Sequence, residues 1–147
     1  MAMIEIEELS TLQEIGNLLA SGKLKALMDK YFDEEPTHEF DYELNKLYIS
    51  FQKYPFSVTV PNYAGETSVF IKFDSDSPND LRILKFVDKN TDIDEVISKL
   101  GSPDFSRDRL DDKTNKMIKY FLGKFSLAID YDEKKIIMAS IFEDEYR

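Results

Sequence analysis

The sequence of 147 residues contains no cysteine, and this absence excludes disulfide bonds, thiolate nucleophiles and thiolate metal ligands. Its single histidine, His38, lies in a polar stretch just after Pro36, so we expect it at the surface or on a strand edge and not in a hydrolase triad. No apolar run reaches the roughly 18 residues of a membrane span. The N-terminal segment carries acid where a signal peptide carries base, so we expect a cytoplasmic protein with no membrane partner.

Basic residues are also scarce relative to acidic ones. The 19 lysines and arginines face 29 aspartates and glutamates, which gives a net charge of −10. Because nucleic-acid binding requires a basic surface, we expect no nucleic-acid partner. A basic protein partner suits this negative field, since complementary charge speeds association and rejects wrong partners. Solubility alone is the alternative explanation of the acidic excess.

What the sequence does contain is enough apolar side chain for a packed core. Hydrophobic residues make up 42 % of the chain and aromatic residues 13 %, which is typical of folded proteins. A chain of this length buries roughly 68 to 70 % of its unfolded surface as one domain. We therefore expect a single domain over residues 1–147.

The N-terminal part has the pattern of helices. Ser10-Thr11-Leu12-Gln13 has the spacing of a capping box, which predicts a helix start at Ser10. Leucines and isoleucines then follow at helical spacing, and Ser21-Gly22 is the expected break into two shorter helices. Pro36 ends the segment, because the residue before a proline is disfavoured in helical geometry. The predicted helices therefore occupy about 10–33.

Beyond Pro36 the apolar period changes to two, which is typical of β-strands. The first pair lies within 40–51, with Asn45-Lys46 as the connection of a hairpin. Further strands are expected at 56–60, 67–74, 81–87, 117–122, 125–131 and 135–142. Turns are expected at Gly123-Lys124 and at Asp132-Glu133-Lys134.

A further helix is expected at 92–100, with Thr91 as its N-cap and Gly101 as its end. The fold class is therefore α+β, in which an N-terminal helical segment and this helix accompany a mainly antiparallel sheet of about six or seven strands. Helices on one face of such a sheet leave the other face to water or to a partner.

Two segments of the sequence, 69–86 and 125–142, align with each other without a gap. The alignment places Asp74 and Asp76 on Asp130 and Asp132, so both segments have the pattern of a strand, an acidic turn and a strand. A duplicated hairpin explains this likeness, with pseudo-repeats at about 40–87 and 92–142, and chance similarity of two amphipathic hairpins is the alternative.

The same aspartate pairs raise the question of a metal site. Asp residues beside a reversal bond the local backbone and favour turns. The segment around Asp74 and Asp76 lacks the glycine and the glutamate of a calcium loop. We therefore interpret the pairs as turn residues and expect neither a cofactor nor a metal. A small metal-dependent hydrolase using Asp74/Asp76 or Asp130/Asp132 is the alternative function.

The segment 93–142 resembles a known family. IDEVISKLGSPD followed by KMIKYFLGKFSLAIDYDEKKIIMASIF is similar to the helix-plus-three-strand unit of proteins with the beta-lactamase-inhibitor-protein-like fold, which small outer-membrane assembly lipoproteins share. The stop Leu100-Gly101-Ser102-Pro103 matches the end of the family's helix. The chain lacks the lipidated cysteine of the lipoproteins and the signal sequence of the secreted inhibitors. The motif marks a scaffold and carries over no functional residue.

Small acidic proteins of this pattern resemble immunity proteins of contact-dependent or polymorphic toxin systems. This resemblance implies a non-enzymatic protein that binds one cognate toxin and blocks the toxin's active site through an acidic surface. The toxin is expected to be a basic protein, for example a nuclease. A non-catalytic adaptor subunit of a larger assembly is a third reading.

Acidic and tyrosine side chains in connecting segments are the candidate partner-binding residues. The charged stretch 104–116, the C-terminus and the proline-bearing connections contribute Asp104, Asp108, Asp111, Asp112, Glu143, Asp144, Glu145, Tyr54 and Tyr63. Acid on a loop could meet a basic toxin groove, and exposed tyrosine often anchors interfaces. The alternatives are a solvated loop, a solvated terminus and, for the tyrosines, core packing.

Overall fold

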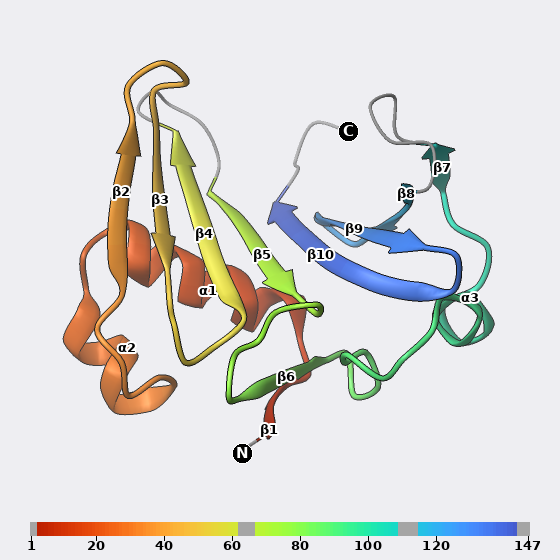
Figure 1. Cartoon of the computed structure of the whole chain (residues 1–147), viewed down its shortest axis with the longest axis horizontal. Coiled ribbons are helices and arrows are strands. Elements are labelled where there is room, and N and C mark those ends of the chain that lie inside the picture. The colour runs from red at the N-terminus through yellow and green to blue at the C-terminus, as the bar shows by residue number, and fades with distance from the viewer. Residues whose placement is uncertain (1–2, 62–66, 109–114, 144–147) are drawn as a thin grey trace.

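The computed structural model describes residues 3–61, 67–108 and 115–143, and their fold is α+β. The helices are α1 (Leu9–Ala20), α2 (Leu24–Lys30) and α3 (Ile93–Leu100). The strands are β1 (Met3–Ile6), β2 (Thr37–Asp41), β3 (Lys46–Ser50), β4 (Phe56–Pro61), β5 (Ser68–Lys72), β6 (Asp80–Ile83), β7 (Phe105–Asp108), β8 (Asn115–Leu122), β9 (Phe125–Asp132) and β10 (Lys135–Glu143) (Figure 1).

Eight of the strands form one antiparallel sheet in the order β2-β3-β4-β5-β10-β9-β8-β7. The order reads as two four-stranded meanders, which we call the N-terminal meander (β2 to β5) and the C-terminal meander (β7 to β10). Their last strands, β5 and β10, pair with each other from Lys72 opposite Met138 to Val69 opposite Ile141. The N-terminal meander follows α1 and α2 along the chain, and the C-terminal meander follows α3 (Figure 1).

The strands β1 and β6 form a separate parallel pair, with Met3 opposite Asp80 and Ile6 opposite Ile83. Ile6 and Ile83 are both buried in the main hydrophobic core. The pair therefore closes the core beside the large sheet and ties the start of the chain to the segment between the two meanders.

The helices cover one face of the eight-stranded sheet, which we call the covered face. In Figure 1, α1 passes behind the N-terminal meander, and it contacts β4, β5 and β10. One cross-strand row of this face runs Val58, Val69, Ile141 and Leu127, and all four side chains are fully buried. The helix α3 lies against the C-terminal meander on the same face, since its Ile93 and Val96 join the same core. Burial of apolar surface at roughly 25 cal/mol per Å² is the main force that holds these layers together.

The helix α1 approaches the sheet closely at Gly16. A Cβ atom built on Gly16 would lie 2.7 Å from Cγ2 of Val69, which is shorter than a normal contact. The absence of a side chain at Gly16 therefore sets the distance between α1 and the N-terminal meander.

The predicted helices are confirmed, but both predicted caps are wrong. The helix α1 begins at Leu9 with Glu8 as its N-cap, and the side chain of Gln13 donates a hydrogen bond to the carbonyl of Thr67 at 3.1 Å instead of closing a capping box. The cap of α3 is Asp92, whose carboxylate accepts from the Glu95 amide at 2.8 Å. The break at Ser21-Gly22 is confirmed, with Gly22 at a φ of 75°.

The predicted hairpin at 69–86 is wrong. The strand β5 is paired on one side with β4 and on the other with β10, so it offers no free edge to the residues that follow it. Those residues pass along the loop after β5 and form β6, which pairs with β1. The segment 125–142 is a hairpin as expected, with its turn at Glu133 and Lys134. The two meanders, residues 37–72 and 105–143, overlap the predicted pseudo-repeats, whose origin by duplication stays a prediction.

Two strands, β1 and β7, were not predicted from the sequence. The strand β1 precedes the predicted helices, and β7 lies in the stretch interpreted as a charged loop, because its sequence Phe-Ser-Arg-Asp has no apolar alternation. The hairpin of β2 and β3 is confirmed, but its connection is the four-residue turn from Tyr42 to Asn45. His38 is exposed on β2, an edge strand, as expected.

Candidate protein-binding face

The second face of the large sheet carries no described helix, and we call it the open face. Side chains alternate between the two faces along a strand, so the residues that flank the buried row of the covered face point to the open face. One row of the open face is formed by residues that pair with one another across five neighbouring strands. From β5 to β7 these residues are Phe70, Ser140, Ala128, Lys119 and Phe105.

The open face of the C-terminal meander is rich in apolar side chains. Five large ones lie outside the main hydrophobic core: Phe105, Met117, Phe121, Met138 and Phe142. Phe70 of the neighbouring strand β5 adjoins them on the same face and also lies outside that core. Phe105 and Phe121 are 46 % and 43 % exposed, and they are two of the five exposed large hydrophobic side chains in the described part of the chain.

The centre of the open face is amphipathic. The ammonium of Lys119 lies 5.5 Å from the centroid of the Phe142 ring, a cation–π contact. Phe142 and Phe121 lie on either side of Ser126, which is fully buried and whose hydroxyl has no hydrogen-bond partner among the described residues. The aromatic rings therefore cover this part of the sheet, with a cation beside them.

Two of the predicted partner-binding acids lie at strand ends of the C-terminal meander, and both are held in place. Oδ2 of Asp104 accepts a hydrogen bond from the backbone amide of Phe121 at 2.7 Å. Glu143 forms an ion pair of 3.1 Å with Lys124. Asp104 also continues the pairing of β7 with β8, since its amide donates to the carbonyl of Lys119 at 2.9 Å. These two acids are therefore fixed at the β7–β8 edge and at the end of β10.

Most of the other predicted partner-binding residues lie outside the described residues. Asp111, Asp112, Asp144, Glu145 and Tyr63 belong to this group. Asp108 is the last residue of β7, and only its backbone is described. The partner-binding roles of these residues stay predictions.

Tyr54 is a core residue, and its predicted place on a partner-facing surface is wrong. Its ring is only 8 % exposed and packs against Phe32, with ring centroids 4.7 Å apart. Its hydroxyl donates to the carboxylate of Asp33 at 2.5 Å. Burial, followed by this hydrogen bond, raises the pKa of Tyr54, and the same bond lowers the pKa of Asp33. The Tyr54 ring is buried because it joins an aromatic cluster around Phe32 that Phe51 and Phe56 complete.

The aspartate pairs considered as metal ligands occupy two different settings. Asp74 and Asp76 follow β5 in a loop, where the Ser75 hydroxyl accepts from the Ser77 amide at 3.0 Å. Asp130 and Asp132 lie within β9, and Asp130 is buried on the open face opposite Met138. Among the described residues, no group of three or more carboxylate or histidine side chains could hold a metal ion.

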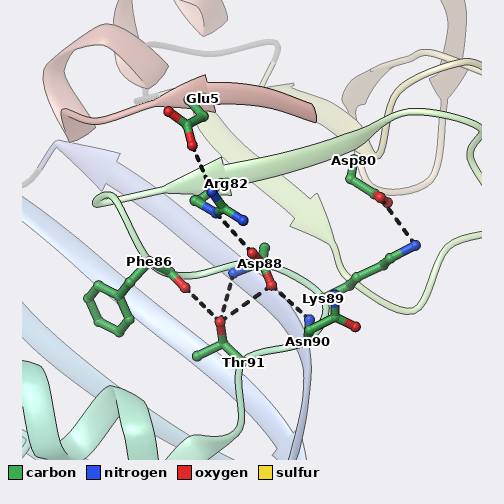
Figure 2. A network of polar contacts seen from close by, with 8 residues as sticks. All are labelled: Glu5, Asp80, Arg82, Phe86, Asp88, Lys89, Asn90 and Thr91. Atoms are coloured by element: carbon green, nitrogen blue, oxygen red, sulfur yellow. Dashed lines mark hydrogen bonds and ion pairs between the residues drawn. The ribbon is translucent and has the colours of Figure 1, made fainter. Parts of the chain in front are cut away.

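A network of polar contacts lies between β1, β6 and the start of α3 (Figure 2). Arg82 bonds Glu5 at 2.7 Å and the buried carboxylate of Asp88 at 2.9 Å, and these two partners raise its pKa. Oδ1 of Asp88 accepts from the Asn90 amide at 2.8 Å.

Thr91 completes this network. Its hydroxyl donates to the carbonyl of Phe86 at 2.6 Å and accepts from the amide of Asp88 at 3.1 Å. This use of the hydroxyl explains why Asp92, and not Thr91, caps α3. The hydrogen bonds and ion pairs drawn in Figure 2 join β1, β6 and the segment before α3, so the network acts as a structural clamp.

The sequence analysis missed the open-face aromatics. The signal that could have found them is a strand that is apolar at consecutive positions, as in Tyr120 to Leu122 and Ile136 to Ala139, which predicts apolar side chains on both faces. Such a strand needs cover on both sides, and the described helices supply it on one side only.

No described helix is long and apolar enough to span a membrane. No protein-family model, curated protein or solved structure matches this chain.

Proposed function

We propose that this protein is a cytoplasmic immunity protein that binds a basic protein toxin through the open face of its C-terminal meander and blocks the toxin's active site without any turnover. The observation that carries the proposal is the group of five large apolar side chains of the C-terminal meander, adjoined by Phe70 of β5, on a sheet face that carries no described helix. Aromatic and methionine side chains are enriched at the centres of protein interfaces, where they fill pockets and exclude water.

Charge supports a basic partner. The chain carries −10, and Asp104 and Glu143 lie just before β7 and at the end of β10. Long-range attraction of this kind raises the association rate, whereas the apolar contacts set the rate of dissociation. The aromatic rings would then provide most of the affinity, and the acidic field would select a basic toxin over neutral proteins.

Affinity capture followed by a protection assay tests the proposal. The full chain is immobilised, lysate of the source strain is passed over it, and a retained toxin is identified by mass spectrometry. The toxin is then expressed in a sensitive cell with or without this protein. We expect protection and stoichiometric inhibition of the purified toxin. Absence of protection by a folded chain that binds the toxin would overturn the immunity function and leave an adaptor.

Variants locate the binding face. Phe105→Ala and Phe121→Ala should each weaken toxin binding by at least about tenfold if the rings are interface anchors. Thr59→Ala, on the open face of the N-terminal meander, is the matched control and should bind like the wild type. Inhibition that is insensitive to both phenylalanine variants would move the interface to another surface.

A further inference from the structure

The strand β2 is one edge of the eight-stranded sheet and pairs only with β3 among the described strands. The outer side of such a strand presents backbone N–H and C=O groups without a strand partner, which are able to pair with an extended segment of another chain. This edge lies at the opposite end of the strand order from β7, so it is separate from the face assigned above (Figure 1).

The turn between β2 and β3 exposes two large apolar side chains. Tyr42 is 88 % exposed and Leu44 is 57 % exposed, the two highest values among large hydrophobic residues in the described part of the chain. The turn that presents them is ordered by Asp41, whose Oδ1 accepts from the amides of Glu43 and Leu44 at 3.0 and 3.1 Å. Tyr42 also packs edge-on against Phe40, with ring centroids 4.8 Å apart. The exposed side chains are thus held in place by the turn.

Carboxylates with an alternate spacing accompany these rings. Residues 31–45 contain six acidic residues and no lysine or arginine. Glu39 and Asp41 lie two residues apart on one side of β2, and a shallow groove joins Glu39 and Glu43 to the rings of Tyr42 and Tyr48. The side-chain carboxylates of Glu39 and Glu43 form no hydrogen bond or ion pair with any described residue. Lys46, opposite Asp41, is the one cation of this hairpin.

We infer that the β2 edge and its turn bind a basic, extended peptide segment of a partner protein by strand addition. Residues two apart in a strand are roughly 6.6 to 6.8 Å apart on one side. A segment with arginine or lysine at every second position therefore places its cations along Glu39, Asp41 and Glu43, while Tyr42 and Tyr48 provide ring faces for cation–π contacts.

Protection of the edge is the competing explanation of the acidic side chains, since charge on an edge strand discourages pairing with other sheets. That explanation accounts for Glu39 and Glu43 but not for Tyr42 and Leu44, which add apolar surface at the position where an edge needs none. The combination of rings and carboxylates selects a cationic strand and rejects neutral or acidic ones. The inference does not depend on the immunity function, because it concerns a different surface.

Two synthetic peptides of identical composition test the inference. One alternates, Arg-Thr-Arg-Thr-Arg-Thr, and the other is segregated, Arg-Arg-Arg-Thr-Thr-Thr. Binding to the full chain is measured by calorimetry at low salt, and backbone amide exchange of β2 is followed by NMR. We expect tighter binding of the alternating peptide and slower exchange at alternate amides of β2, those that do not bond to β3.

Variants separate this surface from the open face. Glu39→Gln combined with Glu43→Gln should weaken the alternating peptide about fivefold, and Tyr42→Ala should weaken it further, whereas Phe105→Ala should leave it unchanged. Tyr42→Ala in turn should leave inhibition of a toxin unchanged. Equal affinity for both peptides without slower exchange in β2 would show attraction by charge alone and overturn the inference, as would the absence of binding at low salt.

Discussion

The two meanders of this protein have the same strand arrangement and similar covered faces, but different open faces. The covered face is continuous and aliphatic across both, as the row of Val58, Val69, Ile141 and Leu127 illustrates. On the open face, the N-terminal meander presents small hydroxyl side chains on its inner strands, namely Ser50, Ser57, Thr59 and Ser68, and charged or aromatic side chains elsewhere, among them Glu39, Tyr48 and Phe70. The C-terminal meander presents the phenylalanine and methionine side chains of the proposed binding face.

This difference separates the requirements of folding from those of binding. A part of a sheet face that only meets water is well served by serine and threonine, as on the inner strands of the N-terminal meander. Apolar side chains on the same face of the C-terminal meander add nothing to the covered core, because they lie on the other side of the sheet. Their cost in solvent exposure is explained if a partner covers them.

The helical layers differ as well. Two helices precede the N-terminal meander, and α1 reaches the sheet closely through Gly16. A single helix of eight residues precedes the C-terminal meander, and it is capped by Asp92 and joined to the sheet by a 2.8 Å bond from the Tyr120 hydroxyl to the Gly101 carbonyl. The helix α1 is therefore attached to the N-terminal meander by a close backbone approach, whereas polar contacts contribute more to the attachment of α3 to the C-terminal meander.

The largest expected effect contrasts the two faces of the C-terminal meander. Leu127→Ala removes a fully buried side chain from the covered face and should lower the free energy of unfolding by about 2 to 5 kcal/mol. Phe105→Ala, on the open face, should lower it by less than about 1 kcal/mol, because the ring is half exposed already. Urea unfolding monitored by circular dichroism measures both. Equal losses would show that the open face belongs to a core and would break the comparison.

A second prediction concerns the close approach in the N-terminal half. Gly16→Ala should destabilise the protein by about 1 to 3 kcal/mol through the clash with Val69, which outweighs the gain of about 1 kcal/mol in helix propensity. The same change in a Val69→Ala background should cost less, since the clashing methyl group is then absent. Thermal unfolding of the four proteins of this cycle gives the coupling. A higher melting temperature for Gly16→Ala alone would contradict the assignment of Gly16 as a spacer.

The smallest expected effect is a difference in pH dependence between the two halves. In the N-terminal half, the Tyr54 hydroxyl holds the pKa of Asp33 below its ordinary value of 3.8. A lowered pKa contributes stability at neutral pH that is lost as the pH falls through the folded-state value. The destabilisation caused by Tyr54→Phe should therefore be larger at pH 7 than near pH 3, as measured by the urea midpoint.

Tyr120→Phe in the C-terminal half is the matched control. The Tyr120 hydroxyl donates to a backbone carbonyl, which does not titrate, so the destabilisation caused by this variant should be the same at both values of pH. If the loss of stability caused by Tyr54→Phe were also the same at both values of pH, the bond to Asp33 would make no contribution to the pH dependence of stability.

Local signals in the sequence predicted local elements well. The break at Gly22, the end of α3 at Gly101 and the turn at Gly123 all have positive φ, the geometry that favours glycine. The hairpin of β9 and β10 followed from its alternating pattern. The capping box at Ser10 failed because Gln13 is buried against the sheet, where its amide bonds Thr67. A tertiary contact thus overrode a local preference.

The candidate site was less predictable. Acidic residues in connecting segments were chosen because charge is visible in a sequence, whereas the faces of a sheet become visible only when its strands are in register. Tyr54 shows the limit of the approach, because the proline beside it suggested an exposed connection while Phe32, distant in sequence, buries its ring. The short strand β7 was hidden for a related reason, since it is defined by pairing with β8 and not by its own residues.

The sequence by itself determined the α+β class, the positions of most helices and strands, the acidic character and the absence of thiol chemistry, because each depends on composition or on contacts between near neighbours. The tertiary structure decided that β5 pairs with β10 and not with β6, that the two meanders form one sheet, and that the phenylalanine side chains gather on a face without a described helix. These features depend on pairing between segments far apart in the chain, and the order of strands in a sheet is not encoded in any single strand.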